Sequence, residues 1–190
     1  SERCIALMER YPGVHATVGI HPNEIPRALV GDWDRIRALV TRSGVVGVGE
    51  TGLDRYWETT PFDVQEEWFA RHLELSARHD VPVIIHCREA EADVLRMLRE
   101  AYDRSGPIRG VMHSFCGSLE TAEACVAMGL YVSFAGMLTY KTAQNVRDVA
   151  ARVPSDCLLV ETDCPYLSPV PFRGKRNEPA HVAHTARQLA

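Results

Sequence analysis

Six short runs of apolar, often β-branched residues recur along the chain. They occupy residues 14–20, 45–49, 81–85, 108–112, 130–134 and 158–160. The runs are continuous rather than alternating, which is typical of parallel strands covered on both faces. Each run therefore predicts a β-strand, and together they predict a parallel sheet.

The longer segments between these runs show helical spacing of apolar residues and helix-capping signals. Residues 1–10 predict a helix that ends at the turn of Tyr11, Pro12 and Gly13. Further helices are expected over 33–40, 61–80, 89–104, 118–128, 142–152 and 178–190. Their expected N-caps include Asp32, Thr60, Ser118 and Thr142.

Four of the predicted strands run directly into side chains that can bind a metal. Glu50, His86 and His113 each follow one strand, and Glu161 and Asp163 follow the last. A (β/α)₈ barrel collects groups from many strand ends on one face. An open doubly wound sheet places its site at one switch point, and no glycine-rich phosphate motif follows a strand here. We therefore predict an α/β fold of the TIM-barrel type, in which six strands leave the barrel incomplete.

Composition and charge narrow the range of functions. With 190 residues, 46% hydrophobic and 24% charged, the chain fits one globular domain over 1–190. It contains no apolar run long enough for a membrane span and no signal-peptide pattern, so a cytoplasmic location without membrane association is expected. A net charge of −4 argues against a chain-wide electrostatic grip on nucleic acid. Any phosphate binding must then be local.

The six cysteines show no C-x-x-C spacing. Cys87, Cys116 and Cys164 lie near candidate metal ligands, so ligation by sulfur has to be considered. Adjacent residues on a strand point to opposite faces, so Cys87 should face away from a site that contains His86. We expect reduced and mostly buried thiols.

A mixed set of imidazoles and carboxylates suits zinc, manganese, cobalt or magnesium. We expect Glu50, His86, His113 and Asp163 to bind metal, because together they form a matched set at strand ends. Taken singly, each has an ordinary structural alternative, such as a solvated turn carboxylate or a strand-end histidine. Two cations a few ångströms apart can activate water and stabilise both oxygens of an in-line phosphoryl displacement. Asp163 is the best candidate to deprotonate that water.

Other residues have supporting roles that the sequence leaves more open. Asp54 and Glu161 are expected to orient metal ligands. His21 is equally suited to an orienting or substrate contact and to a capping role before Pro22. Arg88 is expected to bind substrate phosphate, the alternative being a pair with a neighbouring glutamate. Arg173, with Lys175 and Arg176, forms either a contact to a nucleic-acid backbone or a solvated basic loop.

Six motifs in order resemble those of one family. They are GIHP (19–22), GETGLD (49–54), IHCREA (85–90), HSFCG (113–117), ETDCPY (161–166) and RGKRNEP (173–179). Together they resemble the motifs of TatD-type metal-dependent deoxyribonucleases, and the resemblance spans essentially the whole chain.

The resemblance implies a TIM barrel with a two-metal site. It implies that Glu50 bridges the metals and that His86, His113 and Asp163 complete their shells. Two further histidines would come from an H-x-H motif at the end of the first strand, and no such motif precedes Glu50 here. By resemblance, the chain begins about one helix before the third strand and stops inside the last helix. The barrel would then contain strands 3–8 and lack strands 1–2.

The expected function is that of a deoxyribonuclease that hydrolyses phosphodiester bonds and removes nucleotides from a 3′ end, as a 3′-5′ exonuclease does. It would use two divalent metal ions (Mg, Mn, Zn or Co), act on DNA and be a monomer. One alternative is an amidohydrolase-type hydrolase of a small ester or cyclic amide. Such enzymes often bridge their metals with a carboxylated lysine at a strand end, and neither Lys141 nor Lys175 ends a predicted strand. A second alternative is that the chain is an inactive fragment. Its metal affinity would then be weak, because the H-x-H ligands are absent from it.

Overall fold

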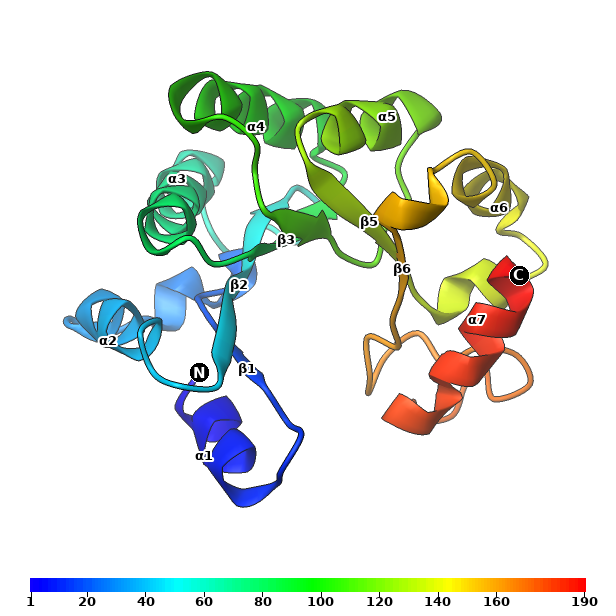
Figure 1. Cartoon of the computed structure of the whole chain (residues 1–190), viewed down its shortest axis with the longest axis horizontal. Helices are drawn as coiled ribbons and strands as arrows, with labels where there is room; N and C mark the ends of the chain where they lie inside the picture. Colours follow the sequence, from blue (N-terminus) through cyan, green and yellow to red (C-terminus); the bar gives the residue numbers. More distant parts are fainter. The chain divides into compact units, whose positions relative to one another are not determined.

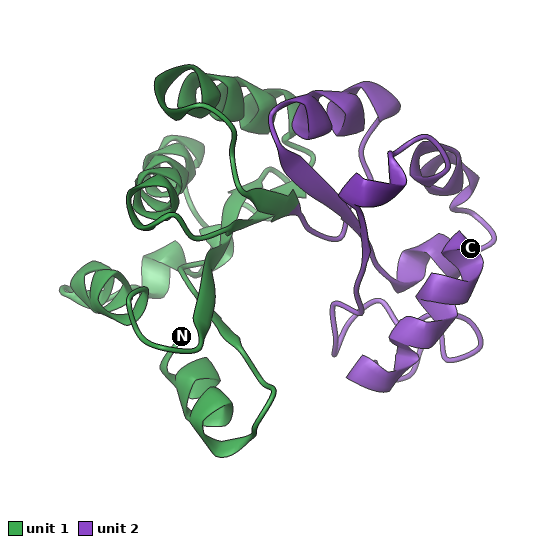
Figure 2. Ribbon diagram, in the orientation of Figure 1, with its two compact units in different colours: residues 1–111 green, residues 112–190 purple.

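The computed structural model describes residues 1–190, which divide into two compact units, Ser1–Val111 and Met112–Ala190 (Figure 2). Six strands follow the chain order, β1 to β6, in a parallel sheet. This confirms the predicted α/β class. The incomplete eight-stranded barrel and the single-domain organisation stay predictions.

Unit 1 alternates strands and helices. Its elements are α1 (Glu2–Arg10), β1 (Ala16–Val18), the 3₁₀ helix η1 (Pro22–Arg27), α2 (Asp32–Leu39), β2 (Val45–Asp54), α3 (Phe62–His79), β3 (Val83–Arg88) and α4 (Glu91–Ser105). Strand β4 (Gly110–Met112) includes the boundary between the units. Within unit 1, β2 lies between β1 and β3 and pairs with both in parallel (Figure 1).

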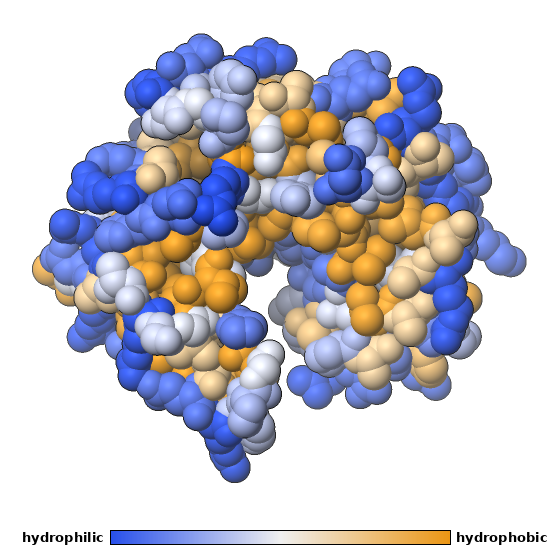
Figure 3. Space-filling model, viewed as in Figure 1, coloured by the Kyte–Doolittle hydropathy of each residue, from blue (hydrophilic) through white to orange (hydrophobic).

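The core of unit 1 lies between these strands and the helices that connect them. Val18 and Val48 of β1 and β2 are fully buried against Ile36 of α2 and Leu75 of α3. In unit 1, hydrophilic residues cover the outer sides of α3 and α4, and hydrophobic residues show toward the strands (Figure 3). This is the distribution expected when amphipathic helices cover apolar parallel strands.

Unit 2 continues the alternation with shorter elements. They are α5 (Leu119–Ala127), β5 (Leu130–Phe134), η2 (Gly136–Thr139), α6 (Gln144–Ala150), η3 (Ser155–Cys157), β6 (Leu158–Val160), η4 (Pro179–His181) and α7 (Val182–Leu189). β5 pairs with β6 in parallel, with Phe134 opposite Val160. The pairing continues one step further, because the Glu161 N–H donates to the Phe134 carbonyl at 3.0 Å. No helix in the chain is both long enough and apolar enough to span a bilayer.

The predicted ends of two strands need correction, because β3 runs through Arg88 instead of ending at residue 85 and therefore contains His86. β5 and β6 have the predicted bounds, but β2 extends through Asp54 instead of ending at Gly49. The extension is possible because Gly49 and Gly52 adopt φ values of +145° and +141°, which favour glycine. Beyond an irregularity in register, Gly52 and Asp54 pair with His86 and Arg88 of β3. Glu50 therefore lies within a strand rather than in a turn after it.

Helix caps were predicted correctly once and wrongly three times. Ser118 is the N-cap of α5, and its hydroxyl accepts from the Thr121 N–H. Gly31 caps α2, so Asp32 lies in the first turn. Ala143 rather than Thr142 caps α6, and Pro61 rather than Thr60 caps α3. Thr60 instead donates its hydroxyl to the Pro22 carbonyl at 2.6 Å, a long-range contact that local sequence does not encode.

Substitution of Gly52 by alanine is expected to destabilise unit 1. A Cβ atom at this position would lie 2.0 Å from the carbonyl oxygen of His86, and its backbone φ of +141° is unfavourable for alanine. We expect a loss of about 3 kcal/mol in the free energy of unfolding, because overpacking and strained backbone add. Urea denaturation measures it. Gly106→Ala is the control, since Gly106 also has positive φ but nothing within 4 Å of its Cβ position; equal losses in both variants would contradict the contact argument.

His72 is a fully buried histidine on α3. Its Nε2 accepts from the Ile20 N–H at 3.1 Å, and its Nδ1 lies 2.6 Å from the Trp68 carbonyl, so Nδ1 donates. The Trp33 ring packs against it at 4.9 Å. These contacts require the neutral ring, and burial lowers the pKa of His72 to about 4.

Acidification is therefore expected to destabilise the fold through His72. The pKa of His72 is about 4 in the folded protein and 6.5 for an unperturbed histidine, as in the unfolded chain. As the pH falls, the unfolded chain therefore takes up a proton at His72 before the folded protein does. The contribution of the neutral His72 to the free energy of unfolding is complete above pH 6.5 and is lost as the pH falls toward 4. Between pH 7 and pH 5 we expect a loss of about 2 kcal/mol. Unfolding free energies at both pH values measure it, and the loss should be smaller in His72→Gln. An unchanged loss in that variant would show that other groups cause it.

Candidate metal centre

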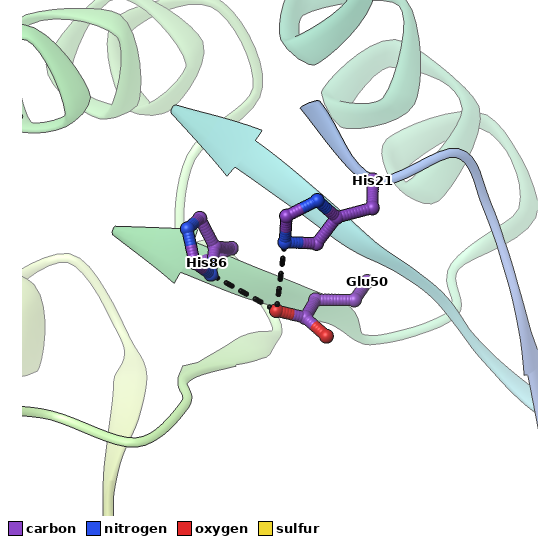
Figure 4. A group of neighbouring side chains, drawn as sticks. All are labelled: His21, Glu50 and His86. Carbon is purple, nitrogen blue, oxygen red and sulfur yellow. Dashed lines mark hydrogen bonds and ion pairs between the residues drawn. The ribbon is translucent and has the colours of Figure 1, made fainter. Parts of the chain in front are cut away.

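Unit 1 brings together two histidines and a carboxylate from three consecutive strand segments. His21 follows β1, Glu50 belongs to β2 and His86 to β3. His86 Nδ1 lies 3.0 Å and His21 Nε2 3.5 Å from the same Glu50 oxygen, Oε1 (Figure 4). The ligand atoms of the three side chains all lie within 4.8 Å of one another. The arrangement is compact enough for a cation to be held within this group.

The second nitrogen of His86 shows how this ring is held. His86 Nε2 lies 3.0 Å from Oδ2 of Asp54, a carboxylate that is only 1% exposed. A neutral imidazole carries one N–H, and donation to Asp54 leaves a lone pair on Nδ1 that faces Glu50. A proton or a cation has to lie between that lone pair and the carboxylate. The donor set therefore fits a divalent cation, and Asp54 has the expected orienting position.

The electrostatics of this pair follow the same logic. Burial would raise the pKa of Asp54, but hydrogen bonds from His86, the Trp57 N–H and Asn23 outweigh it and hold the pKa well below its usual value. Burial would lower the pKa of His86, but its bonds to Asp54 and Glu50 raise it overall. Both pKa shifts have the same cause, because a positive charge between Asp54 and Glu50 is stabilised by these two carboxylates.

Helix α3 fixes the backbone at the end of β2. The buried Gln65 accepts from the Asp54 N–H at 2.8 Å and donates to the carbonyls of Asp54 and Thr60, both at 3.0 Å. The Asp54 side chain in turn accepts from Asn23 Nδ2 at 2.9 Å. Asp54 is therefore held rigidly at both its backbone and its carboxylate, which keeps His86 in one orientation.

His21 combines the two roles between which the sequence did not choose. Its Nδ1 accepts from the Asn23 N–H at 3.1 Å, which caps η1, and its Nε2 faces Glu50. Because Nδ1 accepts, the neutral ring carries its proton on Nε2. In this arrangement His21 donates toward Glu50 and orients that carboxylate, rather than offering a lone pair to a cation.

Unit 2 contains a second group, made of His113 after β4 and of Glu161 and Asp163 after β6. His113 Nδ1 lies 2.8 Å from Glu161 Oε1. Burial would raise the pKa of Glu161, but the hydrogen bond and charge of His113 lower it overall. Glu161, predicted only as an orienting residue, thus lies among the possible ligands themselves.

The four predicted ligands fall into these two groups, one in each unit. Glu50 and His86 belong to the first group, and His113 and Asp163 to the second. No cysteine belongs to either group, and none of the six forms a disulfide. The prediction that the thiols are mostly buried is wrong, because only Cys125 is buried. The loops that follow the strands expose Cys116 and Cys164.

The two predicted substrate arginines both lie over aromatic rings. The Arg88 guanidinium is 3.7 Å from the centre of the Tyr56 ring, and no ion pair joins it to the neighbouring glutamates. Arg173 lies 4.4 Å from the centre of the Tyr140 ring. The sequence reasoning passed over Tyr56 and Trp57, although two adjacent aromatic residues just beyond a strand-end aspartate were a signal for a functional loop.

Comparisons with known proteins agree with the motifs. A family model described as TatD related DNase matches residues 1–190. The Bacillus subtilis protein YabD, named an uncharacterized metal-dependent hydrolase, is 40% identical over 99% of this chain and 73% of its own length. YcfH of Escherichia coli, which carries the same description, is 42% identical over 98% of this chain and 74% of its own length.

Solved structures show the same backbone arrangement. The crystal structure of the TatD homologue YjjV from Escherichia coli matches with a TM-score of 0.91 and 34% identity, over 99% of this chain and 72% of that one. A TatD family hydrolase from Entamoeba histolytica matches with a TM-score of 0.84 at 21% identity, which shows likeness of fold alone. It covers 99% of this chain and 72% of that chain.

Proposed function

The chain belongs to the family of TatD-related DNases, and on this premise we propose that it is a metal-dependent hydrolase of DNA phosphodiester bonds. We propose further that it removes nucleotides from a 3′ end. The observation that carries the proposal is the geometry of His86, whose Nε2 faces Asp54 while Nδ1 faces Glu50 at 3.0 Å. This imidazole and this carboxylate form a preorganised pair of ligands for a cation.

The proposed metal ligands are Glu50 and His86 in unit 1, and His113 and Asp163 in unit 2. Divalent cations bound there would lower the pKa of water and neutralise charge on a phosphodiester. Magnesium, manganese, zinc and cobalt all accept such imidazole and carboxylate donors. Asp54 and His21 would hold the first pair in place, and Glu161 would orient His113 by the 2.8 Å contact.

Proton transfer and substrate binding need further residues. Asp163 is proposed to accept the proton of the attacking water, because a carboxylate at a ligand group can act as a general base. Arg88 is proposed to bind a substrate phosphate through its planar guanidinium. For Arg173, stacked beside Tyr140, we propose a contact with the DNA backbone.

The positions of the lysines support phosphodiester over amide chemistry. Lys141 follows η2 and Lys175 lies in the loop after β6, so both lie outside the strands. A carboxylated lysine at a strand end would therefore have no residue to form it. Glu50 in β2 is the residue available for a bridging role.

A direct assay tests the proposal. Single-stranded DNA labelled at its 5′ end is incubated with the protein and each of the four cations, and parallel reactions contain a chelator or a cyclic amide substrate. Progressive shortening from the 3′ end that stops on chelation is the expected result. Hydrolysis of the cyclic amide without any shortening of DNA would contradict it.

A further inference from the structure

Three side chains at the ends of β2 and β3 form an exposed cluster of aromatic and cationic groups. Tyr56 and Trp57 are 48% and 51% exposed, and their rings meet edge to face at 4.9 Å. The Arg88 guanidinium lies 3.7 Å from the centre of the Tyr56 ring and 5.8 Å from that of Trp57. Half-exposed large aromatics stacked with arginine are costly to leave in water and typical of binding surfaces.

The charge of Arg88 lies over aromatic rings and is not paired with a carboxylate. The neighbouring Arg55 pairs with Asp93 at 2.8 Å and lies over the Phe62 ring, so that arginine has a structural role. Arg88 is exposed and has no such ion pair. A planar cation held against an aromatic ring keeps its remaining N–H groups available for an anion.

Asp54 connects this cluster to the candidate metal group. Its Oδ1 accepts from the backbone N–H groups of Tyr56 and Trp57, both at 2.9 Å, while its Oδ2 contacts His86. Arg88 lies two residues beyond His86 on β3, so both side chains project from the same face of the strand. One buried carboxylate therefore fixes both the position of the aromatic loop and the orientation of a proposed metal ligand.

We propose that the Tyr56–Trp57–Arg88 cluster binds unpaired nucleobases of single-stranded DNA by stacking, with Arg88 on an adjoining phosphate. The proposal rests on the proposed function and defines how its substrate is held. A net charge of −4 offers no general attraction for DNA, so affinity has to come from local contacts. Stacking suits a nuclease that accepts any sequence, because every base has a π-face. Bases in a duplex have these faces covered, which favours a single strand.

Binding without metal tests the cluster separately from catalysis. Fluorescence anisotropy measures the affinity of the full chain, with chelator present, for a labelled oligothymidylate and for an abasic strand of equal length. Trp57→Ala is expected to weaken oligothymidylate binding roughly 5- to 100-fold, the range for loss of one stacked base. Binding of the abasic strand should hardly change, because that strand keeps the phosphates and lacks the bases.

Three further variants make the test specific. Tyr11→Ala is the matched control, since Tyr11 is 46% exposed beside Arg10 but precedes β1, away from the strand ends that carry the site. Trp57→Phe should retain most of the affinity, because it keeps an aromatic face. Arg88→Lys keeps the charge and loses the planar stack, so its affinity for oligothymidylate should fall below that of the parent protein.

The outcomes separate this proposal from the proposed function. Equal losses in Trp57→Ala and Tyr11→Ala, or equal losses for both strands in Trp57→Ala, would overturn the stacking site. Cleavage of DNA with metal is a separate measurement on the same oligothymidylate. Base-dependent binding without cleavage would support the stacking site and refute the nuclease activity. Cleavage without base-dependent binding would support the nuclease activity and refute the stacking site.

Discussion

Replacement of Glu50 by glutamine is expected to reduce metal-dependent cleavage of single-stranded DNA by about 100-fold or more. Glutamine keeps the size of the side chain but removes the charge that His21 and His86 both face. A cation contributes several kcal/mol to stabilising transition-state charge, and each 1.4 kcal/mol is a factor of ten in rate. Loss of a ligand should also lower the affinity for the cation. Initial rates and calorimetric metal titration measure the two effects.

Glu74→Gln is the matched control for this substitution. Glu74 is an exposed carboxylate of unit 1 that pairs with Arg78 one helical turn away on α3. This variant should keep the parent rate and metal affinity, since exposed pairs of this kind contribute little even to stability. If Glu50→Gln cleaved DNA as fast as Glu74→Gln, the assignment of Glu50 as a metal ligand would be wrong.

Replacement of Asp163 by asparagine is expected to lower kcat by roughly 10²- to 10⁴-fold, the usual contribution of a positioned general base. Asparagine preserves shape and also tolerates the positive φ of +53° found at Asp163, so the fold should be retained. It cannot accept a proton from water. Steady-state kinetics at saturating metal measure this loss, because saturation separates the chemical step from weakened metal binding.

The matched control is Asp156→Asn, an exposed aspartate in η3 of the same unit. Its kcat should equal that of the parent. Full recovery of Asp163→Asn at high metal concentration would show that Asp163 serves only as a ligand. The proposed proton transfer would then have to be assigned to another group.

The strand ends illustrate how far the sequence could be followed. Continuous apolar runs predicted β5 and β6 with their observed bounds, because burial on both faces leaves a clear signal. β2 was predicted too short. It contains Gly49 and Gly52, and glycine weakens strand propensity while permitting the backbone conformation that lets β2 pass close to β3.

Individual site roles depended on contacts that have no local pattern. The roles of His21 became clear only through its two nitrogens, one facing the Asn23 N–H and the other facing Glu50. The partners of His72 come from two segments: Trp68, four residues before it on α3, and Ile20 after β1. The contacts of His21 with Glu50 and of His72 with Ile20 follow from packing of segments distant in the chain, and residue type alone does not specify them.

The sequence by itself determined the alternation of strands and helices, the family and the residue types at the strand ends. Periodicity and motifs are local properties, and parallel strands necessarily present their carboxyl ends at the same edge. Only the tertiary structure decided that Glu50 and His86 form one group with His21, and that His113 and Asp163 form another with Glu161. It also decided that Asp54 joins His86 to the exposed Tyr56 and Trp57. These relations depend on strand register and on single hydrogen bonds, which arise when distant segments pack together.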